Sequence, residues 1–138
     1  TPEPLPDPID RWVEVLTPPS LVFEGGPVES EALIALAEVQ GESEAWTLVN
    51  DTLASLDLSL DPAIAAAGVQ RLRVFRGYSG WSPGQLDAEV DEEAWIVLPA
   101  TLDDVFCPGP GDLWRSVLHR QGGRLAWLAN APDDLSAN

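Results

Sequence analysis

The chain lacks lysine and methionine entirely, and it has one cysteine and one histidine among its 138 residues. Because a single cysteine, Cys107, cannot close an internal disulfide, nothing indicates an oxidising compartment. Structural zinc sites need several Cys or His ligands, and the acidic run 57–61 lacks the glycine and the ligand spacing of a calcium loop. We therefore expect no metal and no cofactor.

Long apolar runs are also absent from the sequence. No stretch approaches the roughly 20 apolar residues of a membrane-spanning helix. No basic segment followed by an apolar one opens the chain, so the pattern of a secretion signal is missing. We therefore expect a cytoplasmic protein that does not contact a membrane.

Positive charge is scarce, since 7 arginines stand against 23 acidic residues and the formal net charge is -16. Such a field repels nucleic-acid phosphates and favours basic protein partners. Apart from Arg11, the arginines fall into two groups, one with Arg71, Arg73 and Arg76 and the other with Arg115, Arg120, Arg124 and the single His119. Neither group belongs to a helix-turn-helix pattern, so direct nucleic-acid binding is not expected.

The remaining composition is typical of a folded protein, with 45% hydrophobic and 22% charged residues. The length suits one domain that buries about two thirds of its unfolded surface. Residues 1–8 include four prolines and are expected to form an extended arm. Residues 9–138 are expected to form the single domain.

A strand is predicted near the middle of the chain. Arginines alternate with apolar residues over 71–75, which is the period-two pattern of a half-buried strand. Leu72 and Val74 are expected to face the core, while Arg71 and Arg73 face away from it.

A glycine turn and a helix start follow this strand. Gly77 and Gly80 permit a sharp reversal, because glycine adopts backbone angles that a β-carbon would penalise. Ser82 then suits the N-cap and Pro83 the first helical position. Gln85 stands three residues after the cap, which completes a predicted capping box.

The helix that begins here has a thin apolar stripe, essentially Leu86 and Val90. Its other residues are strongly acidic: Asp87, Glu89, Asp91, Glu92 and Glu93. These carboxylates form either a solvated face or a surface for a basic partner.

The run Gly77 to Leu86, with the sequence GYSGWSPGQL, and the later Trp95 closely resemble the signature of the AlgH/YqgE family of small bacterial proteins. Three further segments match in order: GGPV at 25–28, DLW at 112–114 and DLSAN at 134–138. The resemblance covers about residues 9–138. It implies an α+β fold with a mixed sheet curled toward a small barrel and surrounded by helices. It also implies a role in regulating transcription.

The resemblance has one departure, because the family usually has an additional N-terminal segment that supplies early strands. This chain begins after that segment and contains no methionine. We expect the 138 residues to be either a fragment of a longer gene product or an intact short chain.

The remaining patterns predict a mixture of strands and helices. Strands are expected at 21–23, 45–50, 53–58, 71–75 and 94–98. Helices are expected at 9–16, from near Pro27 with Leu33, Ile34, Leu36 and Ala37 buried, from Asp61-Pro62 to Gly68, after Ser82 and at 112–121, with one helical turn in 101–107. No strict alternation of strands and helices appears, which also favours an α+β fold.

The sequence gives little support to a serine hydrolase or to a catalytic Cys–His pair. A serine hydrolase needs Gly-x-Ser-x-Gly, and Trp81 stands where the second glycine of the Gly77 segment should be. Cys107 and His119 could pair, but no third residue is available to orient them. These patterns favour a protein that is not an enzyme and leave an enzyme of unknown reaction as the alternative.

Two glycine turns, at Gly25–Pro27 and at Gly77–Gln85, are each expected to lead into a helix. Helix starts attract anions, yet neither turn has the sequence of a P-loop. The turns either define the fold or converge on a pocket lined by Tyr78, Trp81 and Gln85. The candidate pocket residues are Gly25, Gly26, Pro27, Gly77, Tyr78, Gly80, Trp81, Pro83, Gly84 and Gln85.

Two functions follow from these observations. The first is a regulatory protein that docks on another protein through its acidic helix and so affects transcription indirectly. The second is a protein that binds a small molecule or an anion at the paired glycine turns, with an enzymatic reaction as one form of it. The sequence leaves the oligomeric state open.

Overall fold

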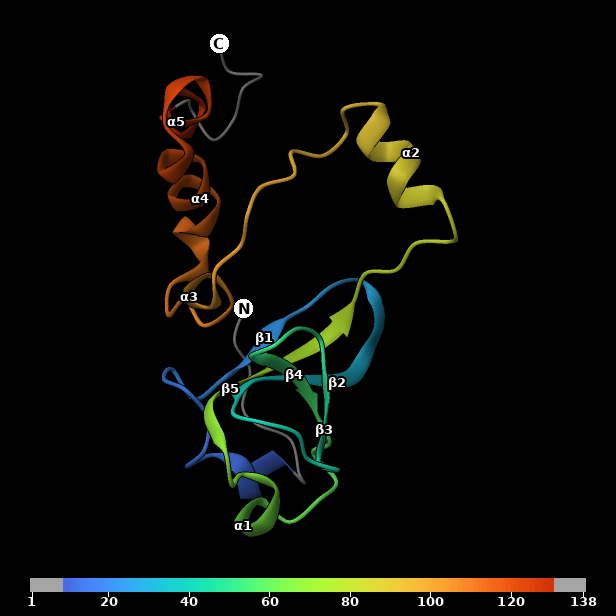
Figure 1. Cartoon of the computed structure of the whole chain (residues 1–138), viewed down its shortest axis with the longest axis vertical. Coiled ribbons are helices and arrows are strands. Elements are labelled where there is room, and N and C mark those ends of the chain that lie inside the picture. Colours follow the sequence, from blue (N-terminus) through green and yellow to red (C-terminus); the bar gives the residue numbers. More distant parts are fainter. Residues whose placement is uncertain (1–8, 131–138) are drawn as a thin grey trace. The chain divides into compact units, whose positions relative to one another are not determined.

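The computed structural model describes residues 9–130 of the chain. They form two compact units, which meet at the Trp95–Ile96 bond (Figure 1). The first unit contains the sheet and the second is helical. The arm expected at 1–8 and the closing DLSAN segment lie outside the described residues, and the single domain over 9–138 stays a prediction.

A five-stranded mixed sheet is the frame of the first unit. Its strands are β1 (Val22–Glu24), β2 (Val28–Val39), β3 (Trp46–Leu48), β4 (Leu53–Leu56) and β5 (Val69–Tyr78). Their order is β1-β5-β2-β4-β3, with β1 parallel to β5 and the other neighbours antiparallel. Among the described residues the sheet is open, with β1 and β3 at its edges, and the expected α+β class is confirmed.

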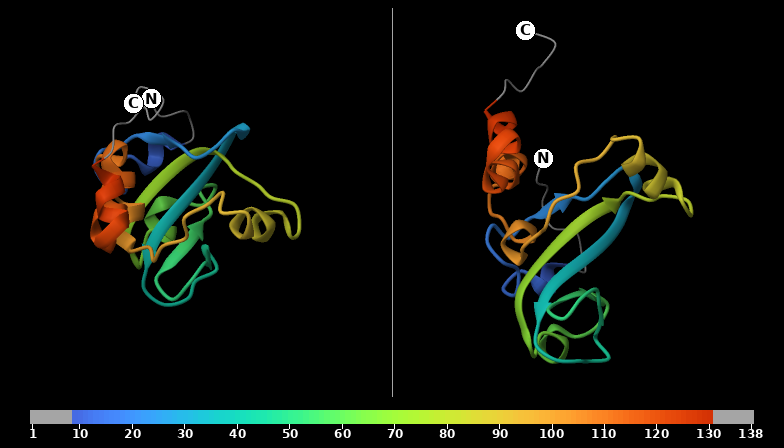
Figure 2. Two further views of the ribbon diagram at one scale, coloured as in Figure 1. Left: turned by 90° about the horizontal axis from the view of Figure 1, so that it is seen from above. Right: turned by 45° about the horizontal axis from the view of Figure 1, so that its top comes forward.

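The long strand β2 stands where a helix was expected to start near Pro27, so that prediction is wrong. The residues assigned to the buried face of the helix were Leu33, Ile34, Leu36 and Ala37. Burial along β2 instead has period two, with Ala35, Ala37 and Val39 fully covered. β2 lies between β5 and β4 and runs beside β5 (Figure 2). An interior strand has apolar residues on both faces, and a short apolar run of this kind can be mistaken for a helix.

The central strand β5 confirms one part of its prediction and contradicts another. Leu72 and Val74 are fully buried, as expected. Arg73 does not face away, because only 2% of it is exposed and its guanidinium lies 4.4 Å from the centre of the Phe23 ring. β5 is paired on both edges, by β1 and β2, so Phe23 from β1 reaches the face on which Arg73 lies.

The core of the first unit is completed by two short helical segments. The first, η1 (Ile9–Trp12), is a single 3₁₀ turn and is shorter than the helix expected there. Trp12 is fully buried and donates its indole N–H to the carbonyl of Leu58 at 3.0 Å. The second, α1 (Pro62–Ala65), begins as predicted, because Asp61 accepts a hydrogen bond from a backbone N–H two residues further on.

The second unit is built from helices. They are α3 (Leu102–Val105), η2 (Pro110–Asp112), α4 (Leu113–Gln121) and α5 (Gly123–Ala129). The helical turn expected in 101–107 and the helix expected at 112–121 are both confirmed. The strand expected at 94–98 is wrong, since this segment joins no sheet and Ile96 and Val97 are exposed.

Candidate functional site

The two glycine turns lie against each other in the first unit. β1 runs parallel to β5, and Val28 at the start of β2 pairs with Tyr78 at the end of β5. A β-carbon on Gly25 would lie 2.3 Å from the carbonyl oxygen of Gly77, and one on Gly77 would lie 2.3 Å from that of Gly26. The close approach of two backbones therefore requires glycine at these positions.

Two pockets adjoin this glycine contact. One has a volume of about 300 Å³ and is lined by Glu24, Gly25, Ile34, Leu36, Phe75, Gly77 and Tyr78. The other has a volume of about 430 Å³ and is lined by Glu24, Gly26, Pro27, Ser30 and Arg76. The pockets thus bring together five of the predicted pocket residues: Gly25, Gly26, Pro27, Gly77 and Tyr78. The other five line neither pocket: Gly80, Trp81, Pro83, Gly84 and Gln85.

Of the two helix starts expected at these turns, the structure contradicts the first and places the second two residues later. Pro27 leads into a strand, so this turn offers no helix dipole to an anion. Helix α2 (Gln85–Asp91) is present, but its N-cap is Gly84, and Ser82 and Pro83 precede it. Half of the predicted capping box forms, because the Gln85 side chain accepts a hydrogen bond from the Ser82 N–H at 3.0 Å.

Glu29 contacts the pocket residue Tyr78, and the sequence did not suggest this contact. It lies in an irregular part of β2 and has a left-handed backbone, with φ 45°. Tyr78 donates its hydroxyl to Oε2 of Glu29 at 3.2 Å. This hydrogen bond and the negative charge of the carboxylate raise the pKa of Tyr78. A strand at this position would have pointed to the contact, but a helix was expected here.

Two tryptophans converge on one carboxylate of helix α2. The Trp81 indole N–H donates to Oε2 of Glu89 at 2.8 Å, and the Trp95 indole N–H donates to the same oxygen at 3.3 Å. The two rings are 5.9 Å apart between centroids and meet edge to face at 70°. Trp81 therefore belongs with Trp95 and Glu89 and not with the glycine pockets.

Helix α2 buries none of its residues. We use the name α2 surface for Trp81, Trp95 and the predicted acidic residues Asp87, Glu89, Asp91, Glu92 and Glu93. All of these residues are exposed except Glu89, which is half-buried. No Lys, Arg or His occurs between positions 77 and 114, so no nearby basic residue in the sequence neutralises this charge.

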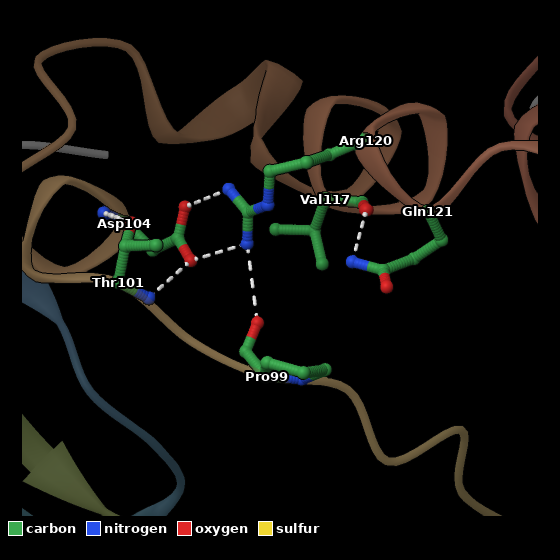
Figure 3. Close-up of polar contacts among 6 residues, drawn as sticks. All are labelled: Pro99, Thr101, Asp104, Val117, Arg120 and Gln121. Atoms are coloured by element: carbon green, nitrogen blue, oxygen red, sulfur yellow. Dashed lines mark hydrogen bonds and ion pairs between the residues drawn. The ribbon is translucent and has the colours of Figure 1, made fainter.

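An ion pair and an apolar groove mark the second unit. Arg120 binds Asp104 through both terminal nitrogens and also donates to the Pro99 carbonyl (Figure 3). The Arg120 side chain holds the pKa of Asp104 at about 2. A groove of about 480 Å³ is lined by Ile96, Leu98, Pro110, Leu113, Trp114, Val117 and Leu118. Helix α4 contributes Leu113, Trp114, Val117 and Leu118 to this groove, and of these only Leu118 is fully buried.

Residues 9–130 contain neither a metal-binding cluster nor a membrane-spanning helix. No three His, Cys, Asp or Glu side chains in this range gather into a group that could hold a metal ion. No helix within the same range is long and apolar enough to cross a membrane.

Comparison with solved structures places the fold among known proteins. A crystal structure of a protein from Corynebacterium diphtheriae is similar with a TM-score of 0.82 and 30% identity, over 91% of this chain and 68% of that one. The solution structure of the AlgH protein from Pseudomonas aeruginosa gives a TM-score of 0.65 over 96% of this chain and 75% of that one. Its identity of 24% supports a likeness in fold alone.

Comparison with known sequences gives the same result. A UPF0301 protein of Thermobifida fusca is 42% identical over 141 residues, which cover 93% of this chain and 70% of that protein. A UPF0301 protein of Streptomyces coelicolor is 40% identical over 144 residues, which cover 100% of this chain and 75% of that protein. The profile of the AlgH-like family matches residues 4–126. The chain therefore belongs to the AlgH-like family.

Proposed function

We propose that this protein has a regulatory role in the cytoplasm and acts by binding another protein through the α2 surface. One observation carries the proposal: α2 leaves both Leu86 and Val90 exposed and buries no residue. A helix that only supports a fold places an apolar stripe against a core. Any effect on transcription is then indirect, through the protein that α2 binds.

The partner is expected to carry a basic surface. The acidic residues of the α2 surface are clustered, and the whole chain has a formal net charge of -16. Opposite charge speeds diffusional encounter and selects against acidic partners and nucleic acids. The interaction should weaken as salt concentration rises, because exposed charges are screened over about 8–10 Å at physiological ionic strength.

Charge reversal tests this proposal. The test variant replaces Asp87, Asp91, Glu92 and Glu93 with Lys. The matched control also introduces four Lys residues, at Glu31, Glu42, Glu44 and Asp51. These positions are exposed as well but lie elsewhere in the first unit. Crosslinking in host cells followed by mass spectrometry should recover the same partner with the wild type and the control. Recovery with the α2 variant should fall about tenfold or more, and equal recovery with all three proteins would contradict the proposal.

A second candidate function is the binding of a small molecule or an anion beside the glycine contact. It is favoured by the convergence of Gly25–Pro27 with Gly77–Tyr78, because pockets of about 300 and 430 Å³ lie beside this contact. Volumes of this size are typical of small-ligand sites. No cofactor is part of this proposal.

Native mass spectrometry of protein isolated gently from its host tests the second candidate. A bound molecule should appear as excess mass that disappears on denaturation. Ser30→Trp should remove it by filling the larger pocket, whereas Ser116→Trp in the second unit should retain it. A mass equal to that of the bare chain in all three samples would sink this candidate.

A further inference from the structure

We infer that Trp81 and Trp95 form the contact for an arginine side chain of the basic partner, with Glu89 as the residue that positions both rings. The inference rests on the proposed function, because it concerns the partner bound by the α2 surface. It adds the chemistry by which that partner is recognised.

The geometry of the tryptophan pair supports this assignment. Trp81 precedes α2 and Trp95 follows it, and yet both indole N–H groups bind one oxygen of Glu89. The polar group of each ring is therefore satisfied by the protein itself. Trp81 and Trp95 nevertheless remain 39% and 49% exposed as residues. What the pair offers to a partner is thus ring surface.

The charge around the pair selects the chemistry of the ligand. A purely apolar partner would have to desolvate Asp87, Asp91, Glu92 and Glu93, which is costly for ionised groups. A cation offsets this cost by pairing with the carboxylates, and it also gains from the negative face of the indole ring. Tryptophan is the best aromatic partner for a cation, and carboxylates beside it add a Coulomb attraction.

Arginine fits this surface better than lysine. Its planar guanidinium can stack on an aromatic ring while its N–H groups still bind carboxylates. The ammonium group of lysine is more strongly hydrated and makes point-like contacts. The α2 surface should therefore distinguish the two residues even though their charges are equal.

Glu89 has a different role from the other acidic residues. It is half-buried, and its Oε2 accepts from both indoles. We expect it to fix the ring orientations through this oxygen. A glutamine keeps an acceptor oxygen at this position, whereas leucine removes it.

Two capped peptides, hexa-arginine and hexa-lysine, provide the test. Binding to the full chain is measured by calorimetry and by NMR of the indole N–H signals. Hexa-arginine should bind roughly 3- to 10-fold more tightly than hexa-lysine. It should shift the Trp81 and Trp95 signals, while the signal of Trp127, which is exposed in the second unit, stays in place.

Variants separate ring contact from charge. Trp81→Leu and Trp95→Leu should lower hexa-arginine affinity much more than hexa-lysine affinity, so that the preference for arginine is lost. Glu89→Leu should also remove the preference for arginine, and Glu89→Gln should retain most of it. Because both tryptophans are exposed, these variants are expected to fold, and circular dichroism checks this.

The outcomes distinguish this inference from the proposed function. If both peptides bind equally and charge reversal on α2 abolishes binding, the basic partner stands and the arginine contact is overturned. If neither peptide binds, the inference is also overturned. Crosslinking in cells then tests the proposed function by itself.

Discussion

Arg120 and Asp104 form a two-pronged ion pair, with both nitrogen–oxygen distances at 2.9 Å. The same carboxylate accepts the backbone N–H of Thr101 at 2.9 Å, and the Thr101 hydroxyl accepts the N–H of Asp104 at 3.3 Å. One side chain thus completes the capping box of α3 and binds the last turn of α4 (Figure 3). The pair links α3 to α4 through two residues that are 16 positions apart in sequence.

Loss of this carboxylate should destabilise the second unit in a pH-dependent way. The pKa of Asp104 falls from 3.8 to about 2, first because Arg120 donates hydrogen bonds to it. A depressed pKa stabilises the fold fully above pH 4, and the effect is lost as pH falls towards 2. Urea unfolding should show Asp104→Asn to be less stable than wild type at pH 6, with the difference vanishing near pH 2. Asp112→Asn, at an exposed carboxylate without a cap hydrogen bond, should leave the stability at pH 6 close to that of wild type.

The contact between Tyr78 and Glu29 should be visible in the titration of the phenol. The chain contains a single tyrosine, so ultraviolet absorbance reports this residue alone. Glu29 raises the pKa of Tyr78 above its ordinary value of 10.0. Its contribution to stability is therefore present below pH 10 and is lost as pH rises through the folded pKa. Glu29→Gln should bring the midpoint back towards 10, and an unchanged midpoint would show that the contact is not made in solution.

The sequence predicted best what is encoded locally. The helix start at Asp61-Pro62 was predicted from these two neighbouring residues, and Asp61 forms the cap of α1. The Thr101–Asp104 box has the same kind of local pattern and could have been found in the same way. Strands β1, β3, β4 and β5 also came from short apolar or alternating patterns.

The failures concern long-range pairing, which local patterns do not report. β2 was mistaken for a helix because its neighbours in the sheet, β4 and β5, come later in the chain. Arg73 was expected in solvent because the ring of Phe23, 50 positions earlier, could not be placed beside it. For the same reason, Trp81 was assigned to the glycine pocket and its contact with Trp95 was missed.

The close contact of the glycine turns gives a sharp mutational test. Gly77 has φ +76° and its added β-carbon would meet the Gly26 carbonyl oxygen at 2.3 Å, so Gly77→Ala should destabilise the protein by about 3 kcal/mol or more. Gly80 lies three residues later without a positive φ, and a β-carbon there would meet its nearest neighbour, an atom of the Tyr78 ring, at 3.9 Å. Gly80→Ala should change stability by less than about 0.5 kcal/mol. Equal losses in chemical denaturation would mean that the turn, and not the backbone contact, sets the requirement.

Trp12 and Trp127 provide a comparison of a buried with an exposed indole. Trp12 is 0% exposed and its N–H binds the carbonyl of Leu58, 46 residues away. Trp12→Phe leaves that carbonyl without its donor and opens a void, so the free energy of unfolding should fall by about 2–3 kcal/mol. Trp127 is 76% exposed. Trp127→Phe should therefore change the free energy of unfolding by less than about 0.5 kcal/mol.

Urea denaturation of both variants, followed by far-ultraviolet circular dichroism, measures this difference without relying on tryptophan fluorescence. If the two substitutions cost the same, then η1 does not hold the sheet through the Trp12–Leu58 hydrogen bond. The larger cost for Trp12→Phe would show that the segment before β1 is an integral part of the first unit, because Leu58 lies just beyond β4.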